Sequence, residues 1–330
     1  MTGTATNQDM QSDKDIAKHR QAYRMVEGLF LSYYFDDDCV HSALSYEAQP
    51  EDVFVVTYPK CGTTWLQYIL CAIFNDGVPP GNSQDFWSKM PFLEACGHIK
   101  RTPRPIAIKT HLPFQKQPYS KQAKYLYLAR NPYDCCVSYF YGIKVAPAYA
   151  FEEGTFEEFL DMFLEGKVEF GDYFENLLSW YKHRHDANVL FMTYEDLTRD
   201  TESGALKIAE FLGKDHGERL RNNPGIVARI LHACSSESMK KTLSDGLFMS
   251  PLERSSESSP LKNRTSKEAS EVFFRLLAKI PFMRNPVRKG VIGDWRNHFT
   301  EDQVRSMKNW ITMRTADSDV MNLWENENLP

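Results

Sequence analysis

The segment TYPKCGTTW at residues 57–65 has the residue types of a phosphate-binding turn. It follows an apolar run and precedes apolar residues with helical spacing, which predicts a strand–turn–helix unit. A helix N-terminus presents backbone N–H groups and a positive dipole end to an anion. Gly62 lets the backbone approach a phosphate closely, Lys60 adds a mobile positive charge, and the threonines after Gly62 add hydroxyl donors. The alternative is an ordinary strand-to-helix turn with an exposed lysine.

The order of residues in this turn distinguishes it from a Walker A loop, in which Lys follows a glycine and directly precedes Ser or Thr. Here Lys60 precedes the only glycine of the segment. A P-loop kinase would also need a magnesium-binding acid, and the sequence offers no convincing set. A kinase, and a nucleotide-binding protein without catalysis, are the two rival functions.

Lys109 and His111 lie two residues apart at the end of the apolar run 105–111. Alternate residues of a strand share a face, so the two side chains are expected side by side. A neutral imidazole can remove a proton from an acceptor while Lys stabilises developing negative charge. The nearby Lys also disfavours imidazolium and keeps the base unprotonated. A structural histidine is the alternative.

Two further cationic clusters could bind a second phosphate. Arg130 and Ser138 flank a turn into a predicted helix, and Arg at a strand end suits bidentate phosphate contact. A simple pair between Arg130 and Asp134 is the alternative. Arg288, Lys289 and Gly290 form the other cluster, with a glycine for close approach.

Strands alternating with helices must position these groups. Apolar runs at 53–59, 105–111, 124–130 and 188–194 predict buried parallel strands. The expected fold is α/β, with one domain whose central parallel sheet is flanked by helices and binds ligands beyond the strands' carboxyl ends. Residues 1–25 are predicted to be a flexible tail and 26–330 the domain, with a mobile Ser-rich loop at 250–268.

Composition excludes several classes of protein. The net charge of −5 disfavours a nucleic-acid partner, so an anion site must be a local cluster of Lys and Arg. The seven cysteines have neither a paired framework nor zinc spacing, which favours reduced thiols and no metal. There is no signal-peptide pattern and no apolar stretch long enough for a membrane span, so a cytoplasmic location is expected.

The motifs together resemble those of cytosolic sulfotransferases that use 3′-phosphoadenosine 5′-phosphosulfate (PAPS). The 57–65 segment is similar to the family's 5′-phosphosulfate loop, TYPKSGTTW. The resemblance extends from about residue 50 to about residue 300. It includes KTHLP (109–113), RNPYD (130–134), YEDL (194–197) and RKGVIGDW (288–295).

The resemblance implies a role for each matching residue. His111 would be the general base, with Lys60 and Lys109 as catalytic cations and with PAP as product. The donor would be bound by Lys60, Cys61, Gly62, Thr63, Thr64, Trp65, Arg130, Ser138, Tyr194, Cys234, Ser235, Met239, Arg288, Lys289 and Gly290. The acceptor would be a small, aromatic molecule with a hydroxyl or an amine.

The sequence departs from the family at several positions. Ser236 stands where the family usually has Phe beside the adenine, so one stacking face is expected to be lost. Cys61 replaces the usual Ser of the loop; its backbone N–H remains, so phosphate binding is expected to survive. The alternative is an exposed thiol beside Lys60 that is redox-sensitive. The dimer motif KxxxTVxxxE is degenerate at 296–305, so the family's usual dimer is not carried over.

Acceptor choice is the least constrained part of this interpretation. Aromatic segments at 30–41, 86–98 and 139–151 are candidates for the wall of an apolar acceptor pocket. The run Asp36, Asp37 and Asp38 is compatible with a cationic amine such as a catecholamine, although a solvated acidic turn explains it equally simply.

Overall fold

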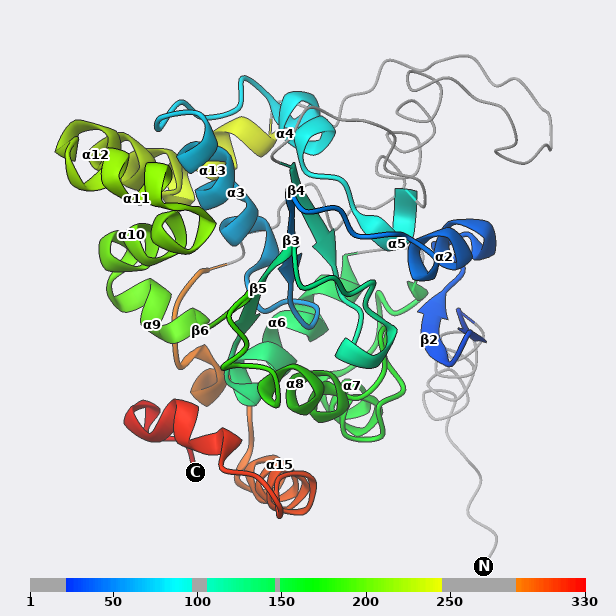
Figure 1. Ribbon diagram of the computed structural model, residues 1–330. Helices are drawn as coiled ribbons and strands as arrows, with labels where there is room; N and C mark the ends of the chain where they lie inside the picture. The colour runs from blue at the N-terminus through cyan, green and yellow to red at the C-terminus, as the bar shows by residue number, and fades with distance from the viewer. Residues whose placement is uncertain (1–21, 97–105, 146–148, 245–288) are drawn as a thin grey trace, which may run out of the picture.

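A central parallel sheet organises the computed structural model, which describes residues 22–96, 106–145, 149–244 and 289–330 (Figure 1). Within these residues the main sheet has four strands in the order β4-β3-β5-β6. They are β3 (Asp52–Val56), β4 (Ile106–Thr110), β5 (Lys124–Ala129) and β6 (Val189–Thr193). Three of them fall within predicted apolar runs, and β3 begins one residue before the run predicted at 53–59. All pairs are parallel, so the expected α/β fold is confirmed.

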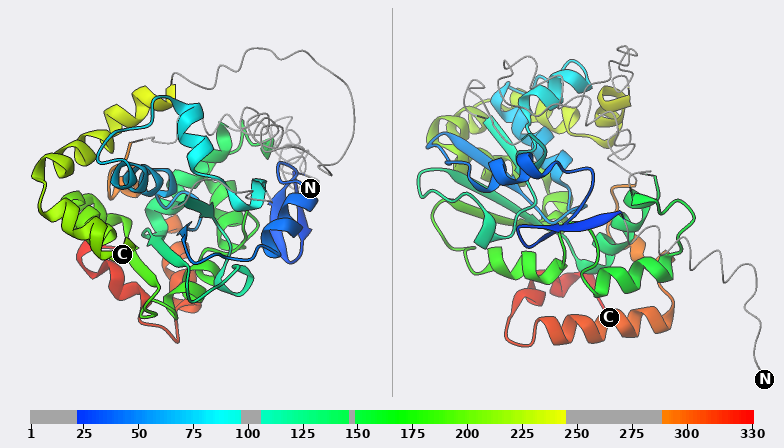
Figure 2. Two further views of the ribbon diagram at one scale, coloured as in Figure 1. Left: turned by 45° about the horizontal axis from the view of Figure 1, so that its top comes forward. Right: turned by 90° about the vertical axis from the view of Figure 1, so that its right-hand side faces the viewer.

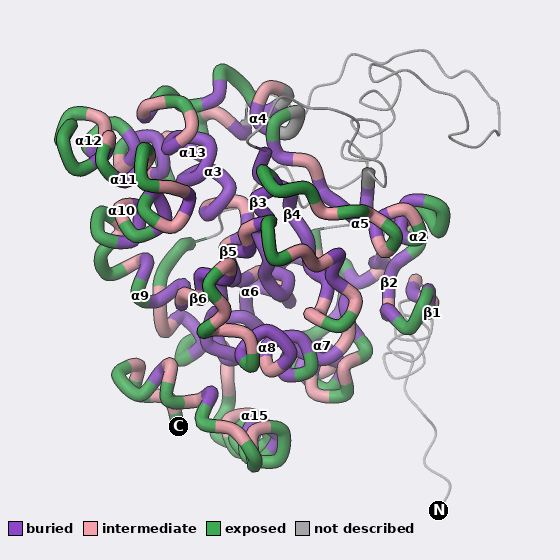
Figure 3. The backbone as a smooth tube through the Cα atoms, viewed as in Figure 1, coloured by how far each residue is buried: buried purple, intermediate pink, exposed green. Residues whose placement is uncertain are grey.

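Both faces of the sheet are covered by helices, which explains why its strands read as continuous apolar runs. On β5, Tyr127 stacks on Trp180 of α8 (Tyr173–Tyr181), whereas Leu128 approaches the start of α3 (Thr63–Phe74). Successive side chains of a strand point to opposite faces, so α8 and α3 lie on opposite sides. Figure 3 accordingly shows the strands as buried and the outer helices as partly exposed.

The remaining helices form two groups around the sheet. Figure 1 shows α3 with α10–α13 to the left of the sheet and α6, α7, α8 and α15 below it. The first group, with the short α9, has the bounds α9 (Tyr194–Arg199), α10 (Thr201–Leu212), α11 (Lys214–Arg221), α12 (Pro224–Ala233) and α13 (Ser236–Ser244). The second group comprises, besides α8, α6 (Pro132–Lys144), α7 (Phe156–Leu164) and α15 (Glu301–Arg314). Shorter helices are α2 (Asp37–Leu44), α4 (Ser83–Lys89) and α5 (Leu93–Cys96).

Helix boundaries follow the capping signals in the sequence. Thr155 begins α7 with a capping box to Glu158. Asp200 caps α10, and Gly213 follows its last residue. These local signals therefore predict where helices start and stop around the site.

An antiparallel hairpin precedes the main sheet. Strands β1 (Tyr23–Val26) and β2 (Leu29–Ser32) pair across Glu27 and Gly28, which both have positive φ, as a two-residue turn requires. Residues 23–25 therefore belong to a strand, which corrects the end of the tail predicted at 1–25. Residues 1–21 and the predicted loop 250–268 lie outside the described residues.

Asp134 of α6 anchors the C-terminal segment that begins at residue 289. Its buried carboxylate accepts hydrogen bonds from the backbone N–H groups of Gly293 (2.7 Å) and Trp295 (3.0 Å). These residues enter the one-turn helix η4 (Asp294–Asn297), which contacts α6. Figures 1 and 2 show that the chain then continues through α15, which lies at the far end of the molecule from α4.

The positions of the degenerate dimer motif form contacts within the chain. Arg296 donates to the backbone carbonyls of Glu327 and Asn328, Thr300 caps α15, and Arg305 pairs with an acid one turn away. Among the helices that the structure describes, none combines the length and apolar character needed to cross a membrane.

Replacing Asp134 by Ala should destabilise the protein because two backbone N–H groups lose their acceptor in a buried site. The expected loss is about 3 kcal/mol in the free energy of unfolding, measured by urea denaturation. Asp317→Ala, at an exposed position, is the control and should change stability by less than about 0.5 kcal/mol. Equal stability of the two variants would contradict the role of Asp134.

Candidate active site

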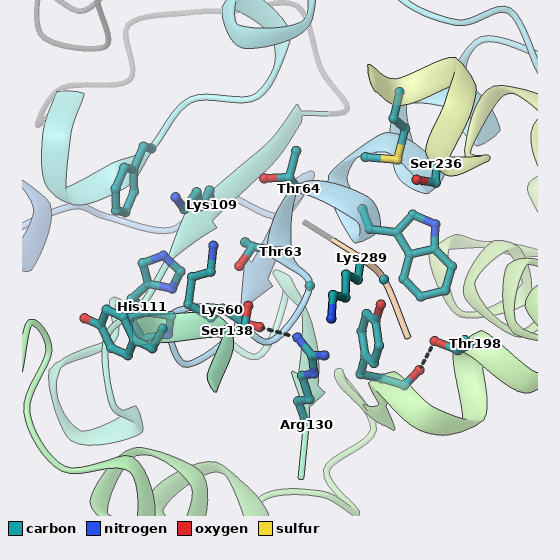
Figure 4. A pocket seen from close by; sticks show the side chains of 18 of the residues that line it. Lys60, Thr63, Thr64, Lys109, His111, Arg130, Ser138, Thr198, Ser236 and Lys289 are labelled. Atoms are coloured by element: carbon teal, nitrogen blue, oxygen red, sulfur yellow. Dashed lines mark hydrogen bonds between the residues drawn. The ribbon is translucent and has the colours of Figure 1, made fainter. Parts of the chain in front are cut away.

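Residues following all four parallel strands converge on one cavity. Lys60 lies in the turn after β3, His111 follows β4, Arg130 follows β5 and Tyr194 follows β6. The cavity has a volume of about 400 Å³ and lies at the carboxyl ends of the strands, where α/β sheets bind ligands. Figure 4 shows His111, Lys60 and Lys109 at its left, Thr198 and Ser236 at its right, and Arg130 and Lys289 between them.

The turn between β3 and α3 presents backbone donors to the cavity. Lys60 (φ 70°) and Gly62 (φ 101°) both adopt positive φ, which bends the chain sharply before the helix. A Cβ at Gly62 would lie 2.8 Å from the ring of Tyr194, so only glycine fits. No side chain of the described residues caps the first turn of α3, which leaves its N–H groups available to an anion. Lys60, Thr63 and Thr64 line the cavity beside them.

The thiol of Cys61 points into the protein interior, which overturns the alternative of an exposed, redox-sensitive thiol. The residue is fully buried and its Sγ lies 3.7 Å from Sγ of Cys135 on α6. Burial and the hydrogen bond with Cys135 raise its pKa well above the usual value. The backbone N–H of Cys61 donates to the carbonyl of Tyr58 (3.3 Å). Cys61 is thus a packing residue of the turn.

His111 is held in the tautomer that a general base needs. Its Nδ1 lies 2.7 Å from the carbonyl oxygen of Thr57, which can only accept, so Nδ1 carries the proton and Nε2 the lone pair. Burial, followed by the positive charges of Lys109 and Lys60, lowers the pKa of the imidazole well below 6.5. The ring packs edge-on against Phe92 and Phe170, which restricts its orientation.

Glu94 supports the end of β4 and was missed by the sequence analysis. Its Oε1 accepts from the backbone N–H of His111 (2.6 Å) and from the hydroxyl of Thr110 (2.9 Å). Burial raises the pKa of this carboxyl to about 7. The sequence signal that could have identified it is a single acidic residue within the otherwise apolar stretch 90–96.

Lys109 shares the face of His111, as the strand period predicts. It is 7% exposed, and its Nζ lies 3.9 Å from the centre of the Phe92 ring. This cation–π contact holds the ammonium group beside the cavity that the imidazole lines.

Arg130 occupies the centre of the cavity wall. Its guanidinium donates to the carbonyl of Lys60 (3.2 Å), packs over the ring of Tyr194 (4.5 Å), and has a buried Nε without a partner among the described residues. Asp134 instead accepts hydrogen bonds from the backbone N–H groups of Gly293 and Trp295. The structure therefore does not support the alternative of a simple Arg130–Asp134 ion pair. A buried donor of this kind suits an anionic ligand.

The other members of this predicted phosphate site come from α6 and from the C-terminal segment. Ser138 of α6, Lys289 and Gly290 line the cavity with Arg130. Lys289 pairs with Asp294 (2.8 Å), and Gly290 has φ 70°. Arg288 lies outside the described residues.

Trp65 and Tyr194 form an aromatic corner of the cavity. Their rings contact edge to face at 5.4 Å, and Trp65 donates to the carbonyl of Cys234 (3.1 Å). The predicted residues Cys234, Ser235 and Met239 line this corner together with Ser236. Sequence analysis missed further lining residues, namely Thr198, Thr201 and Leu231. Thr198 bonds to the carbonyl of Tyr194 within one helical turn, a local contact that no motif marked.

Aromatic side chains surround the part of the cavity near His111. Each of the three aromatic segments singled out in the sequence contributes, and the lining includes Tyr34, Phe35, Phe92, Tyr139 and Tyr149. Glu169 and Phe170 complete this wall and were not anticipated. In the described part of the chain, no cluster of His, Cys, Asp and Glu is arranged to hold a metal ion.

Comparison with known proteins agrees with this arrangement. The sulfotransferase domain model matches residues 50–269. Mouse sulfotransferase 1 family member D1 is 33% identical over 286 residues, covering 83% of this chain and 86% of that protein. Bovine sulfotransferase 1E1 is 33% identical over 272 residues, covering 79% of this chain and 82% of that protein.

A solved sulfotransferase structure also aligns with most of this chain. The crystal structure of mouse sulfotransferase SULT7A1, complexed with PAP, aligns with a TM-score of 0.66 at 30% identity, over 92% of this chain and 98% of that one. Because the domain match spans more than half of the chain and agrees with these relatives, the chain belongs to the sulfotransferase family.

Proposed function

We propose that the protein transfers the sulfuryl group of PAPS to a hydroxyl, or an amine, of a small aromatic acceptor, with His111 as general base. The observation that carries this proposal is the hydrogen bond from His111 Nδ1 to the Thr57 carbonyl. It leaves a basic Nε2 in the same cavity as two separate groups of anion-binding residues.

The donor fits because the cavity offers a site for each of its charged ends. The N–H groups at the start of α3, with Lys60, Thr63 and Thr64, suit the 5′-phosphosulfate. Arg130, Ser138, Lys289 and Gly290 suit the 3′-phosphate, and the unpartnered Nε of Arg130 would gain an acceptor there. The aromatic corner of Trp65 and Tyr194 suits the adenine. The PAP bound to the mouse relative supports this assignment.

The reaction would be a single in-line displacement at sulfur. Nε2 of His111 takes the acceptor proton as the acceptor oxygen forms its bond to sulfur. The bond between sulfur and the 5′-phosphate oxygen breaks, and PAP leaves with that electron pair. Lys60 and Lys109 would stabilise the negative charge on the transferring group and on the departing oxygen. Much of the rate acceleration then comes from holding donor, acceptor and base in line.

The aromatic wall near His111 favours a planar acceptor. Phe92 and Phe170 contact the imidazole ring, so an aromatic acceptor packed against this wall would present its hydroxyl to the base. The acceptor is therefore expected to be a phenol or a related aromatic molecule.

His111→Ala should lower kcat by at least about 100-fold because proton removal is lost. Calorimetric titration with PAP should give a dissociation constant within about threefold of the wild-type value. His185→Ala, at a position away from the cavity lining, is the matched control and should leave kcat unchanged. Near-normal turnover with weakened PAP binding would refute the assignment.

Arg130→Ala should raise the KM for PAPS by about 10- to 100-fold through loss of charge-assisted hydrogen bonds. Steady-state kinetics with adenosine 5′-phosphosulfate, which lacks the 3′-phosphate, should show little difference between variant and wild type. Arg305→Ala, which removes an exposed guanidinium, serves as control. An equal effect of Arg130→Ala with both donors would argue against the 3′-phosphate role.

The pH dependence of kcat/KM should reflect the neutral state of His111. A base with a lowered pKa stays unprotonated through neutral pH, so activity should fall only below about pH 6.5. The variant Glu94→Gln removes the neighbouring carboxyl, whose pKa is about 7, and should retain this acidic limb. An acidic limb centred above pH 7 in both proteins would contradict the lowered pKa.

A further inference from the structure

Glu169 is a buried carboxylate in the aromatic wall that faces the acceptor. It is 6% exposed and lines the same cavity as His111. The next residue, Phe170, places its ring 5.0 Å from the imidazole ring. Glu169 therefore lies beside the position proposed for the acceptor.

The backbone around Glu169 is held in an unusual conformation. Phe170 has φ 66°, a left-handed conformation that is unfavourable for a bulky residue and persists only where the surroundings enforce it. The N–H of Phe170 donates to the carbonyl of Phe30 (2.7 Å), and the hydroxyl of Tyr139 donates to the carbonyl of Glu169 (2.8 Å). These bonds keep both side chains at the cavity wall.

The carboxylate retains capacity for one more hydrogen bond. Its Oε1 accepts from the backbone N–H (3.2 Å) and the hydroxyl of Ser32, and its Oε2 accepts from the hydroxyl of Tyr149 (2.6 Å). A carboxylate has about four acceptor positions, so one position on Oε2 remains for a donor in the cavity.

The charge of Glu169 is only partly compensated by the protein. Burial raises the pKa of its carboxyl, while the hydrogen bonds from Ser32 and Tyr149 and the charge of Lys109 act in the opposite direction. A cation bound in the cavity would compensate this buried charge further. An adjoining depression, which shares Tyr34 and Phe35 with the cavity, adds negative charge nearby. It is lined by Asp36, Asp37 and Asp38 against one basic residue, Arg24, which pairs with Asp37.

We propose that Glu169 selects acceptors that carry a protonated amine in addition to the hydroxyl that is sulfated. This inference rests on the proposed sulfuryl transfer, and it assigns the remaining acceptor position of Oε2 to the ammonium group. A purely structural role, in which Glu169 only ties Ser32 to Tyr149, predicts no discrimination between charged and neutral acceptors.

A matched pair of phenols tests the proposal by binding alone. Tyramine and 4-ethylphenol differ by the amine, and each is titrated calorimetrically into the protein saturated with PAP. The wild type should bind tyramine at least about 10-fold more tightly. Glu169→Gln should weaken tyramine binding by about 10- to 100-fold and leave 4-ethylphenol within twofold, because the amide retains the shape and loses the charge.

Two further variants test whether the effect depends on the negative charge of Glu169. Asp161→Asn removes an acid from an exposed position on α7 and should change neither affinity. Glu169→Asp keeps the charge on a shorter side chain and should keep a weakened preference for tyramine. If the wild-type protein binds the two phenols with equal affinity, the proposal is wrong. It is also wrong if Glu169→Gln weakens the binding of both phenols to the same extent.

Turnover with PAPS is recorded separately for both phenols. Sulfation of either phenol agrees with the proposed function. Absence of turnover, with the amine preference and its loss in Glu169→Gln both intact, would count against sulfuryl transfer and still support the role of Glu169 in binding.

Discussion

Thr57 connects the three segments that meet at the carboxyl end of the parallel sheet. Its N–H donates to the carbonyl of Thr110 (3.3 Å), and its own carbonyl accepts from Nδ1 of His111 (2.7 Å). Its hydroxyl bonds to that of Thr63 at the start of α3 (2.6 Å). One residue therefore holds both the imidazole of His111 and the turn before α3. Any shift of β3 relative to β4 would change the position of the imidazole relative to this turn.

A second constraint is the free-energy cost of placing several positive charges around one cavity. The protein as a whole has a net charge of −5, yet one cavity is lined by Lys60, Lys109, Arg130 and Lys289. Aromatic faces lower this cost, since Phe92 lies under the ammonium group of Lys109 and Tyr194 under the guanidinium of Arg130. The aromatic residues of the site thus stabilise the protein's own cations as well as suiting planar ligands.

Local patterns were sufficient to predict the sheet and much of the site. Four apolar runs gave the four strands. Residues at the strand ends, such as His111 and Arg130, were found because parallel strands bring their carboxyl ends together.

The errors and omissions have a common physical cause, which is packing between distant segments. The alternative of an exposed thiol at Cys61 arose because nothing in its own segment indicates that α6 covers it. Glu94 and Glu169 act through partners 16 to 137 residues away along the chain. No periodicity in the sequence encodes such contacts. Phe170 reaches the imidazole only through a positive φ that its residue type disfavours.

The C-terminal 3-10 helix η5 (Val320–Glu327) is connected to the cavity wall through hydrogen bonds of the buried Glu195. Glu195 accepts from the indole N–H of Trp324 (2.8 Å) and from the backbone N–H of Asn131 (3.0 Å), the residue directly after Arg130. This contact limits where a fusion partner can be attached to the recombinant protein. An affinity tag or a reporter fusion placed directly after Trp324 would disturb the neighbour of Arg130 in the cavity wall.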